Sequence, residues 1–417
     1  MPLPPLLERP YLAHPLGAIP TEPHVRQSMA LRPWFILSAL AIARIAFGYQ
    51  FQTIATLGYD LVPRFGLSYS EFGAMIGAYM LLGAFVALPM GMLGRRFGDR
   101  VVLGTGLAFM VIGACYGVWD GDPAGIAAGR SIAGVGAVAM IVLQGKIIAD
   151  WFTGKRFMMA ISVSVCAYPV GVGLAQLVLP PLTQAFGWQV ALLSDAVLAA
   201  VAFLLFVGSF RPAPHVAERT RGFSWPSGRE CVLLAIGGLA WTAYTAGYAG
   251  YMSYVPTTLA LRGDSLVLIG LVMTIATWGN VPATMFGGGL AARFGAFRIL
   301  LIGTVCLVIG MVGTALTGYP VFWSLLVGIL GSIHPGVIMA VGTLSARPEN
   351  RAVGMALFYS IYYAGGTLGP TLCGVSADLM GDPAGGVLAA AVISVAVVPI
   401  FLLHRRLGRH ETMLPRP

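Results

Sequence analysis

The chain has 417 residues, of which 57% are hydrophobic and only 10% are charged, and its mean hydropathy is +0.82. A water-soluble domain carries about 25% charged residues because its surface faces water. The composition therefore excludes a soluble globular protein and predicts an integral membrane protein. The net charge of +9 would also suit nucleic-acid binding. However, the cations are spread over many short loops instead of forming one basic patch, so no nucleic-acid partner is expected.

The first 33 residues differ from the rest of the chain, because they contain eight prolines and no sustained apolar run. They also lack the basic start, short apolar stretch and small-residue cleavage site of a signal peptide. We expect residues 1–33 to form a disordered cytoplasmic tail.

Apolar stretches long enough to span a membrane follow this tail. A helix needs about 20 mostly apolar residues to cross a hydrocarbon core of about 30 Å. Polar and Pro/Gly clusters leave twelve such stretches, at 34–57, 70–93, 101–119, 124–150, 157–180, 189–210, 231–256, 267–290, 298–316, 320–345, 353–377 and 385–403. The predicted fold class is therefore all-α integral membrane, with six-helix halves at 34–210 and 231–403. A cytoplasmic linker at 211–230 joins the halves, and 404–417 form a cytoplasmic C-terminal tail.

Lysine and arginine residues predict the sidedness of these spans. The two tails, the even-numbered loops and the central linker together hold 20 of them, whereas the odd-numbered loops hold only Arg64 and Arg262. Cytoplasmic loops carry an excess of basic residues. Both termini are therefore expected in the cytoplasm, with the chain in the cell membrane.

A charged segment at the end of the second span is repeated in the second half. GMLGRRFGDR at 91–100 is matched by GGLAARFGAFR at 288–298, with five identities at one offset of 197 residues. The identical pairs are Gly91 and Gly288, Leu93 and Leu290, Arg96 and Arg293, Phe97 and Phe294, and Gly98 and Gly295. The same offset lays spans one to six on spans seven to twelve. Two similar six-helix halves are typical of secondary transporters, in which one half rocks against the other.

The 91–100 segment resembles the signature motif of the major facilitator superfamily, roughly G-x-L-(A/G)-D-R-x-G-R-(R/K), and the resemblance covers about residues 34–405. The matching residues are Gly91, Leu93, Gly94, Arg96, Gly98 and Arg100. The resemblance implies two pseudo-symmetric halves and a loop that latches them during switching. The usual aspartate of the motif is replaced by Arg95, and an acid appears four residues later as Asp99. Whether Asp99 takes over its role is left open.

Shorter resemblances lie in spans four and five. Arg130, Gly134 and Gly136 look like the family motif R-x-x-x-G-x-G, which implies a conformational or proton-related role for Arg130. Pro169, Gly171 and Gly173 are loosely similar to a glycine-rich antiporter motif. The stretch KIIADWFTGKR at 146–156 is similar to a loop in branches that handle nitrate, cyanate and small carboxylates.

The energy source is predicted to be a gradient. The sequence contains no GxxxxGK[ST] motif, and the linker of about 20 residues is too short for a nucleotide-binding domain. The five cysteines are far apart and form no metal-spaced cluster. We therefore expect a monomeric secondary transporter, which is not an enzyme and uses no cofactor.

Ionisable residues inside spans are costly and so are functional candidates. The deep charges are Arg44, Arg130 and Lys146, whereas the acids Asp150 and Asp195 lie near span ends. A cavity with fixed cations and no carboxylate favours an anion. Arg44 lies about ten residues into the first span, roughly 15 Å deep. Because a guanidinium binds a carboxylate or oxyanion bidentately, Arg44 is the expected anion anchor.

Further candidates lie in other spans, with Lys146 near the inner end of the fourth. In the resembled family spans 1, 4, 7 and 10 line the central cavity, and Arg44, Lys146, Trp241 and His334 fall one on each. Lys146 has Asp150 at i+4 as an alternative partner. His334, which Pro335 follows, is a substrate contact, a proton site or a satisfied interior residue. Asn280, Tyr244 and Tyr248 are polar-tipped candidates for the same site, with packing as the alternative role.

The favoured function is alternating-access transport of a small anion, either an organic carboxylate or an inorganic oxyanion, with a proton as a candidate co-substrate. A proton-coupled exporter of drugs or hydrophobic compounds is the alternative, and the missing buried acid is the chief objection to it. A membrane sensor on the same scaffold is a third reading, disfavoured because neither end shows a signalling domain.

Overall fold

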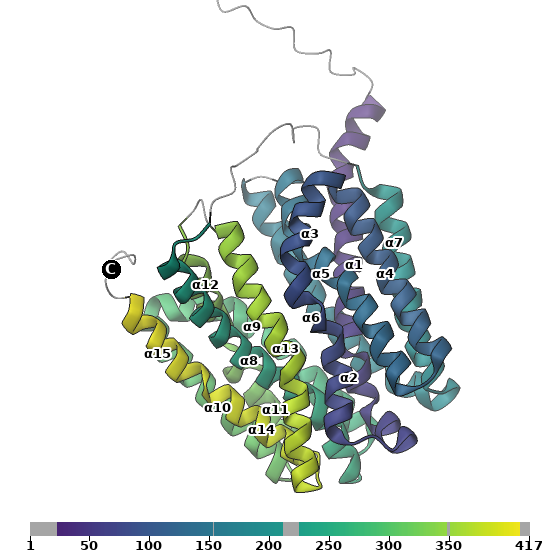
Figure 1. The fold of residues 1–417 in the computed structure, drawn as a ribbon, viewed down its shortest axis with the longest axis vertical. Helices are drawn as coiled ribbons and strands as arrows, with labels where there is room; N and C mark the ends of the chain where they lie inside the picture. The colour runs from purple at the N-terminus through teal and green to yellow at the C-terminus, as the bar shows by residue number, and fades with distance from the viewer. Residues whose placement is uncertain (1–22, 153, 212–224, 348–350, 409–417) are drawn as a thin grey trace, which may run out of the picture.

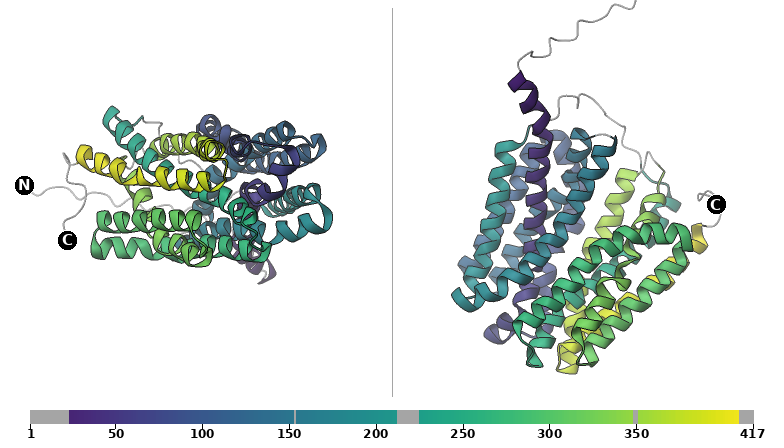
Figure 2. Two further views of the ribbon diagram at one scale, coloured as in Figure 1. Left: turned by 90° about the horizontal axis from the view of Figure 1, so that it is seen from below. Right: turned by 180° about the vertical axis from the view of Figure 1, so that it is seen from behind.

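The computed structural model describes residues 23–152, 154–211, 225–347 and 351–408, and within these ranges the regular structure is entirely helical. Figure 1 shows two groups of helices, α1–α7 and α8–α15, which diverge toward the end where α1 begins and converge at the opposite end. The view from behind in Figure 2 shows the same divergence. We call the end that carries Gly98 and Gly295 the termini side, and the end that carries Gly66 and Gly263 the far side.

Seven helices form the first half. They are α1 (Pro23–Phe65), α2 (Tyr69–Leu81), α3 (Gly83–Phe97), α4 (Asp99–Asp120), α5 (Pro123–Trp151), α6 (Gly154–Phe186) and α7 (Trp188–Ser209). The second predicted span is thus divided into α2 and α3. α1 begins earlier than expected, at Pro23, so it includes residues 23–33 of the expected tail, whereas residues 1–22 lie outside the described part of the chain. Good helix formers such as Ala30, Leu31 and Arg32 extend a helix that the buried span has already nucleated.

The second half is built from α8 (Gly228–Leu261), α9 (Leu266–Phe294), α10 (Ala296–Leu316), α11 (Pro320–Gly328), the 3₁₀ turn η1 (Leu330–Ser332), α12 (Pro335–Leu344), α13 (Arg351–Met380), α14 (Ala384–Val395) and α15 (Val397–Gly408). Within the described ranges, eleven helical stretches are long and apolar enough to cross a membrane. The 30-residue α13 is long enough but less apolar, and it packs between α2 and α8. With α13 the structure agrees with the predicted twelve-span fold of two halves.

The sequence repeat is also a repeat of backbone conformation. Gly98 between α3 and α4 has φ 84° and ψ 146°, and Gly295 between α9 and α10 has φ 95° and ψ 133°. Essentially only glycine adopts this region of backbone space without strain. Arg96 and Arg293, two residues earlier, each lie over the next phenylalanine, at 5.5 and 5.4 Å from the ring centroid. The spacing repeated in the two halves therefore produces the same reversal of the chain twice.

The repeat also includes the far side, although the motif at 91–100 does not extend there. Gly66 and Gly263, again 197 residues apart, both have positive φ, at 60° and 85°. Ser68 caps α2 and Ser265 caps α9, and each side chain accepts a hydrogen bond from the backbone N–H three residues later. An N-cap of this kind satisfies a backbone donor that the helix itself leaves unpaired. The two halves thus share both connections around their second spans.

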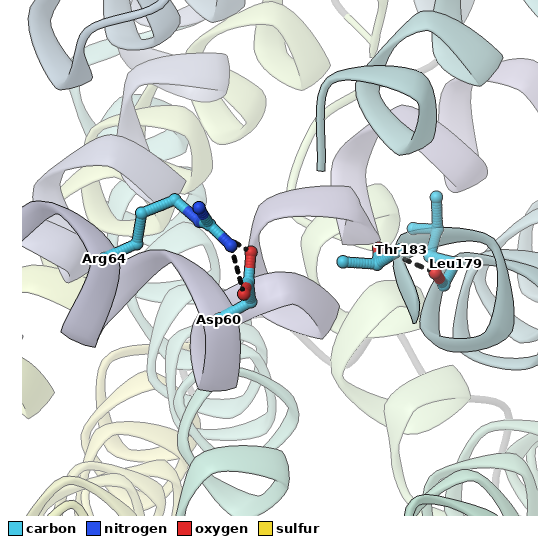
Figure 3. A network of polar contacts seen from close by, with 4 residues as sticks. All are labelled: Asp60, Arg64, Leu179 and Thr183. Carbon is cyan, nitrogen blue, oxygen red and sulfur yellow. Dashed lines mark hydrogen bonds and ion pairs between the residues drawn. The ribbon is translucent and has the colours of Figure 1, made fainter. Parts of the chain in front are cut away.

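The last turn of α1 lies beyond the apolar part of the chain. In Figure 3, Arg64 forms a two-pronged contact with Asp60 through Nε and Nη2, at 3.1 and 3.0 Å, while on α6 the hydroxyl of Thr183 donates to the carbonyl of Leu179. α1 has 43 residues and is therefore about 64 Å long, twice the thickness of a hydrocarbon core. An exposed ion pair at this end is what a helix that projects into water needs.

The two halves are joined at the far side by a cap that crosses between them. The carboxylate of Asp378, at the end of α13, accepts hydrogen bonds from the backbone N–H groups of Tyr69 and Ser70 at the start of α2, at 2.6 and 2.9 Å. The hydroxyl of Tyr254 on α8 donates to the carbonyl of Tyr69 at 2.8 Å. We call these interactions the far-side contact. They hold the halves together at the end opposite their divergence.

Candidate functional site

Arg44 is a partly exposed cation without a counter-ion. Its side chain makes no hydrogen bond or ion pair with any described residue, and its Nε is buried without a partner. Its guanidinium carbon lies 5.5 Å from the ring centroid of Phe47 and 5.7 Å from that of Tyr168. These aromatic faces attract the cation but leave its N–H donors free. The donors are therefore available to an anion.

Tyrosines from both halves of the protein lie near this arginine. Those close enough to interact with its charge are Tyr168 on α6 and Tyr359, Tyr362 and Tyr363 on α13. We call Arg44, these four tyrosines and Trp241 the Arg44 cluster. The sequence prediction missed the tyrosines, although the run FYSIYY at 358–363 is a visible signal. Most of the cluster is partly exposed, whereas Tyr363 is buried.

Trp241 joins the two walls of this cluster. Its ring centroid lies 6.5 Å from that of Tyr362 and 5.9 Å from that of Tyr244, which is buried on the same helix, α8. Tyr244 in turn stacks on Tyr248 at 6.0 Å. The structure therefore places Arg44 and Trp241, one contributed by each half, near the same side chain, Tyr362.

The tenth span is broken where its candidate residue lies. α11 ends at Gly328, η1 follows, and His334 precedes Pro335 at the start of α12. Proline has no N–H to donate and suits the first turn of a helix. The structure thus places His334 at the junction of two half-helices, an arrangement found at the binding sites of some transporters.

Asn280 on α9 supports this break. Its Nδ2 donates to the hydroxyls of Tyr244 and Ser332, both at 3.0 Å, and its Oδ1 accepts from Thr284 at 3.2 Å. Thr284 also donates to the carbonyl of Ser332 at 3.1 Å. The amide therefore holds η1 against α8 and α9, and its hydrogen-bonding groups are already in use.

His334 is fully buried. Its ring lies edge-on to Tyr244, with centroids 5.0 Å apart, and neither ring nitrogen makes a well-directed hydrogen bond, although the backbone of Gly331 lies near. A Cβ atom added at Gly303 on α10 would overlap its Nδ1. The imidazole thus faces α10 and Tyr244, away from direct access in this conformation.

Lys146 is paired with Asp99 and not with Asp150, which the sequence offered as its partner. Its Nζ lies 2.8 Å from both carboxylate oxygens of Asp99, the first residue of α4. The reason is tertiary, because α4 and α5 pack closely side by side. Through this pair Asp99 joins two helices of the same half.

The other described contacts of the 91–100 loop also stay within the first half. Nη2 of Arg100 donates to the carbonyl of Val207 on α7 at 2.9 Å. Arg96 is exposed. Gly91 and Arg95 lie in α3, but their surroundings fall outside the described part of the chain. A latch between the halves remains a prediction, because the halves diverge at this end.

Arg130 ties three helices together. It is buried on α5 and donates to the carbonyls of Gln50 and Phe51 on α1 and of Met75 and Ile76 on α2, at 2.9–3.3 Å. One turn further along α5, a Cβ at Gly134 would overlap the carbonyl oxygen of Tyr79 on α2. The arginine and the glycine of this motif therefore serve the same close approach of α5 to α2.

Asp195 is the functional candidate that the sequence prediction undervalued. It is the eighth residue of α7 and is only 6% exposed, so it is a buried acid within a span. Its Oδ1 lies 2.7 Å from Oγ1 of Thr53 on α1, and it shares a small cavity with Gln50, Tyr79 and Arg130. The signal was an acid inside an otherwise purely apolar span.

A family profile described as Major Facilitator Superfamily matches residues 36–370 and, again, residues 239–416. An uncharacterized MFS-type transporter of Enterobacter sp. (strain 638) is 26% identical over 356 residues, which cover 82% of this chain and 88% of the relative. Protein spinster homolog 1 of Xenopus laevis is 25% identical over 43% of this chain, and azole resistance protein 1 of Saccharomyces cerevisiae is 23% identical over 48%. These last two are matched over only 36% and 33% of their own lengths.

Solved structures share the fold over almost the whole chain. A bacterial homolog of the human lysosomal transporter Spinster, in an inward-facing and occupied conformation, has a TM-score of 0.74 at 18% identity, covering 93% of this chain and 99% of that one. The nucleoside transporter NupG has a TM-score of 0.70 at 12% identity, covering 90% and 100%. At such identities the likeness concerns the fold alone.

Proposed function

Because this chain belongs to the Major Facilitator Superfamily, we propose that it is a secondary active transporter that carries a small organic carboxylate by alternating access. The observation that carries the proposal is Arg44, a partly exposed guanidinium between the two halves with no acid beside it. A carboxylate supplies the charge-assisted hydrogen bonds that this side chain lacks, each worth about 1.5–3 kcal/mol.

The surroundings of Arg44 favour an organic anion over an inorganic oxyanion. The ring centroid of Tyr168 lies 5.7 Å from the guanidinium carbon, and Tyr359 and Tyr362 lie close enough to interact with its charge. Aromatic rings stabilise a flat apolar body by stacking, with about 0.5–1.5 kcal/mol beyond the area they bury. Nitrate or phosphate has no apolar body and gains nothing from these rings.

We assign the remaining candidates by their contacts. Trp241 and Tyr244 form the wall of the site contributed by α8. Asn280 stabilises the break in the tenth span, and His334 lies at this break. Lys146 acts through its ion pair with Asp99. Arg44 is left as the anchor that meets the substrate directly.

We also propose that both termini face the cytoplasm of a cell membrane, since the basic residues gather on the termini side. Single cysteines at Gly121 and Gly318 are then expected to react with an impermeant reagent added outside intact cells. A cysteine at Ser227 is expected to stay unlabelled, and the reverse pattern would contradict this sidedness.

A thermal-shift screen tests the substrate class. The purified protein is heated with acetate, benzoate, nitrate, phosphate and a tetraalkylammonium cation. A ligand that binds only the folded state raises the melting temperature, by a stabilisation of about 2.7 kcal/mol at one hundred times its Kd. We expect carboxylates to stabilise the wild type and the cation to have no effect.

Arg44→Gln is the matched control for this screen. It keeps a polar side chain but shortens it and removes its charge and most of its donors. We expect it to fold with an unchanged melting temperature in the absence of ligand and to lose the carboxylate effect. An equal shift in wild type and variant would show that Arg44 is structural and that this site is wrongly assigned.

Proton-coupled export of a hydrophobic compound is the second candidate function. Two observations favour it. Asp195 is a buried acid of the kind that the sequence prediction considered missing, and the site is rich in aromatic side chains. One partial relative is named for azole resistance. Stabilisation by uncharged or cationic aromatic compounds, undiminished in Arg44→Gln, would favour this function over carboxylate transport.

A further inference from the structure

We propose that Asp195 is the proton-binding site of this transporter. Its carboxyl group is protonated in the conformation described here and exchanges its proton when α1 moves against α7. This inference rests on the proposed function only in that the protein is a gradient-driven transporter. It holds whichever substrate the Arg44 cluster binds.

Burial without a counter-ion is the first support. Asp195 is 6% exposed, and neither of the two ion pairs found among the described residues includes it. An isolated ionised carboxylate in such a place carries a desolvation cost of several kcal/mol. A neutral carboxylic acid avoids this cost, provided that its O–H finds an acceptor.

Hydrogen-bond geometry supplies that acceptor. Oγ1 of Thr53 lies 2.7 Å from Oδ1 of Asp195 and 2.9 Å from the carbonyl oxygen of Tyr49 on the preceding turn of α1. A threonine hydroxyl has one hydrogen to donate. With an ionised Asp195, only one of the two short contacts is a hydrogen bond. With a protonated Asp195, the acid donates to Thr53 and Thr53 donates to Tyr49, so both contacts are satisfied.

The groups that face Asp195 explain why proton loss has a consequence. From α1 they include Tyr49, whose hydroxyl bonds to Ser194 beside Asp195, and from α2 and α5 they are Tyr79 and Arg130. The cavity residues contributed by α4 are glycine and alanine, which do not titrate. Among these groups Arg130 is the single cation, but its donors are occupied by four backbone carbonyls.

The protonated and ionised states of Asp195 therefore differ in the hydrogen-bond partners of Arg130. When the carboxyl O–H bond breaks and the proton passes to water, the new carboxylate attracts the guanidinium within their shared cavity. Arg130 then exchanges backbone contacts on α1 and α2 for a charge-assisted bond to Asp195. Because Arg44 lies on α1, nine residues or about 14 Å from Thr53, this exchange acts on the helix that carries the substrate anchor.

Infrared spectroscopy of the ligand-free protein tests the protonation directly. We expect the purified wild type to show the C=O stretching band of a protonated carboxylic acid at neutral pH and to lose this band on titration to alkaline pH. Asp195→Asn is expected to lack the band, and Asp195→Glu to restore it at a shifted frequency. Asp150→Asn is the matched control, since Asp150 also lies in a span, and it should keep the band.

A distance measurement tests the coupling. Spin labels replace Val101 and Arg298, which are exposed at equivalent positions on the termini side of the two halves, in a background without the native cysteines. We expect the inter-label distance of the wild type to change between acid and alkaline pH. Asp195→Asn should keep the acid-pH distance throughout, whereas Asp150→Asn should behave as the wild type.

Two results would overturn the proposal. If the band is absent at neutral pH or survives in Asp195→Asn, then Asp195 holds no proton. If the distance change persists unaltered in Asp195→Asn, then its proton is not coupled to the movement. Because no ligand is used in either measurement, both outcomes are independent of the carboxylate screen and of the role of Arg44.

Discussion

The two halves of this protein share a backbone and differ in charge. Both turn at glycines of the same conformation on the termini side, and both cap the following far-side helix with a serine at the same offset. In contrast, five ionisable side chains in the helices of the first half have uncharged counterparts in the second half. Arg44, Asp99, Arg130, Lys146 and Asp195 correspond to Trp241, Ala296, Val327, Thr343 and Val392.

This difference separates two kinds of constraint. A membrane helix must satisfy its own backbone and reverse at the surface, and both halves meet this need with the same residues. Charge within the membrane has no such structural need and is costly to retain. We infer that the first half contributes the groups that bind the anion and the proton. The second half contributes aromatic rings and the broken tenth span.

The largest expected effect separates Arg44 from its counterpart, Trp241. Arg44→Lys keeps the charge but loses the two-pronged donor, so the affinity for benzoate should fall more than tenfold, which is about 1.4 kcal/mol or more. Trp241→Leu removes only stacking, about 0.5–1.5 kcal/mol, and should weaken binding by at most about tenfold. Isothermal titration of both variants measures this. Equal losses of benzoate affinity would mean that charge and stacking contribute equally to binding. The two halves would then not differ in their contribution to the site.

Backbone turns should show the opposite behaviour, namely equal effects in the two halves. Gly98→Ala and Gly295→Ala both force a Cβ into a glycine-only conformation, at a cost of about 1–3 kcal/mol each. Thermal unfolding should show comparable losses for both variants. Gly289→Ala is the control, because a Cβ there meets open space on a helix. A loss for only one of the two turn variants would mean that the repeat is not mechanically equivalent.

The far-side contact is where the halves meet, and breaking it should shift the balance of conformations. Asp378→Ala removes the acceptor of two backbone N–H groups at the start of α2, a capping interaction worth about 1 kcal/mol, equivalent to roughly a fivefold change in population. Spin labels at Arg64 and Leu379, both exposed on the far side, should report a larger fraction of long distances. Ser265→Ala removes a cap within one half and should leave the distances unchanged. A shift with Ser265→Ala as well would indicate general loosening.

The same contact predicts a pH dependence. Partial burial opposes the ionisation of Asp378, but the hydrogen bonds from Ser70 and Tyr69 outweigh it and hold its pKa below the ordinary value. A group with a lowered pKa stabilises its contact above that pKa and loses the effect as the pH falls through it. The far-side labels should therefore separate only under strongly acidic conditions. Separation near neutral pH would contradict this assignment.

The smallest effect is expected from the ion pair that only the first half contains. The Lys146 side chain is 42% exposed and Asp99 12%, so solvent screens the pair. Asp99→Asn should lower the free energy of unfolding by less than about 1 kcal/mol, and high salt should abolish the difference. Asp150→Asn, next to the pair but outside it, should change nothing. A salt-independent loss would point to a structural role for Asp99 at the start of α4.

Much of the fold was predictable because the membrane imposes simple rules. Span length, the positions of Gly98 and Gly295 and the repeat offset all follow from local needs of the chain. Arg44 could be singled out as a candidate anchor for the same reason, since a charge within a span is conspicuous in any membrane sequence, and its role in binding stays a prediction. The tyrosines of α13 were not singled out, because a tyrosine is common in membrane helices and becomes a site residue only through its neighbours.

The sequence by itself determined the membrane class, the two-half architecture and the suspect charges, because these depend on composition and spacing along one chain. Only the tertiary structure decided the partners. It joined Lys146 to Asp99 instead of Asp150, engaged Asn280 with Tyr244 and the break in the tenth span, and buried Asp195 beside Thr53. A hydrogen bond or ion pair acts over a few ångströms in space. Which residues lie that close depends on how helices distant in sequence pack together.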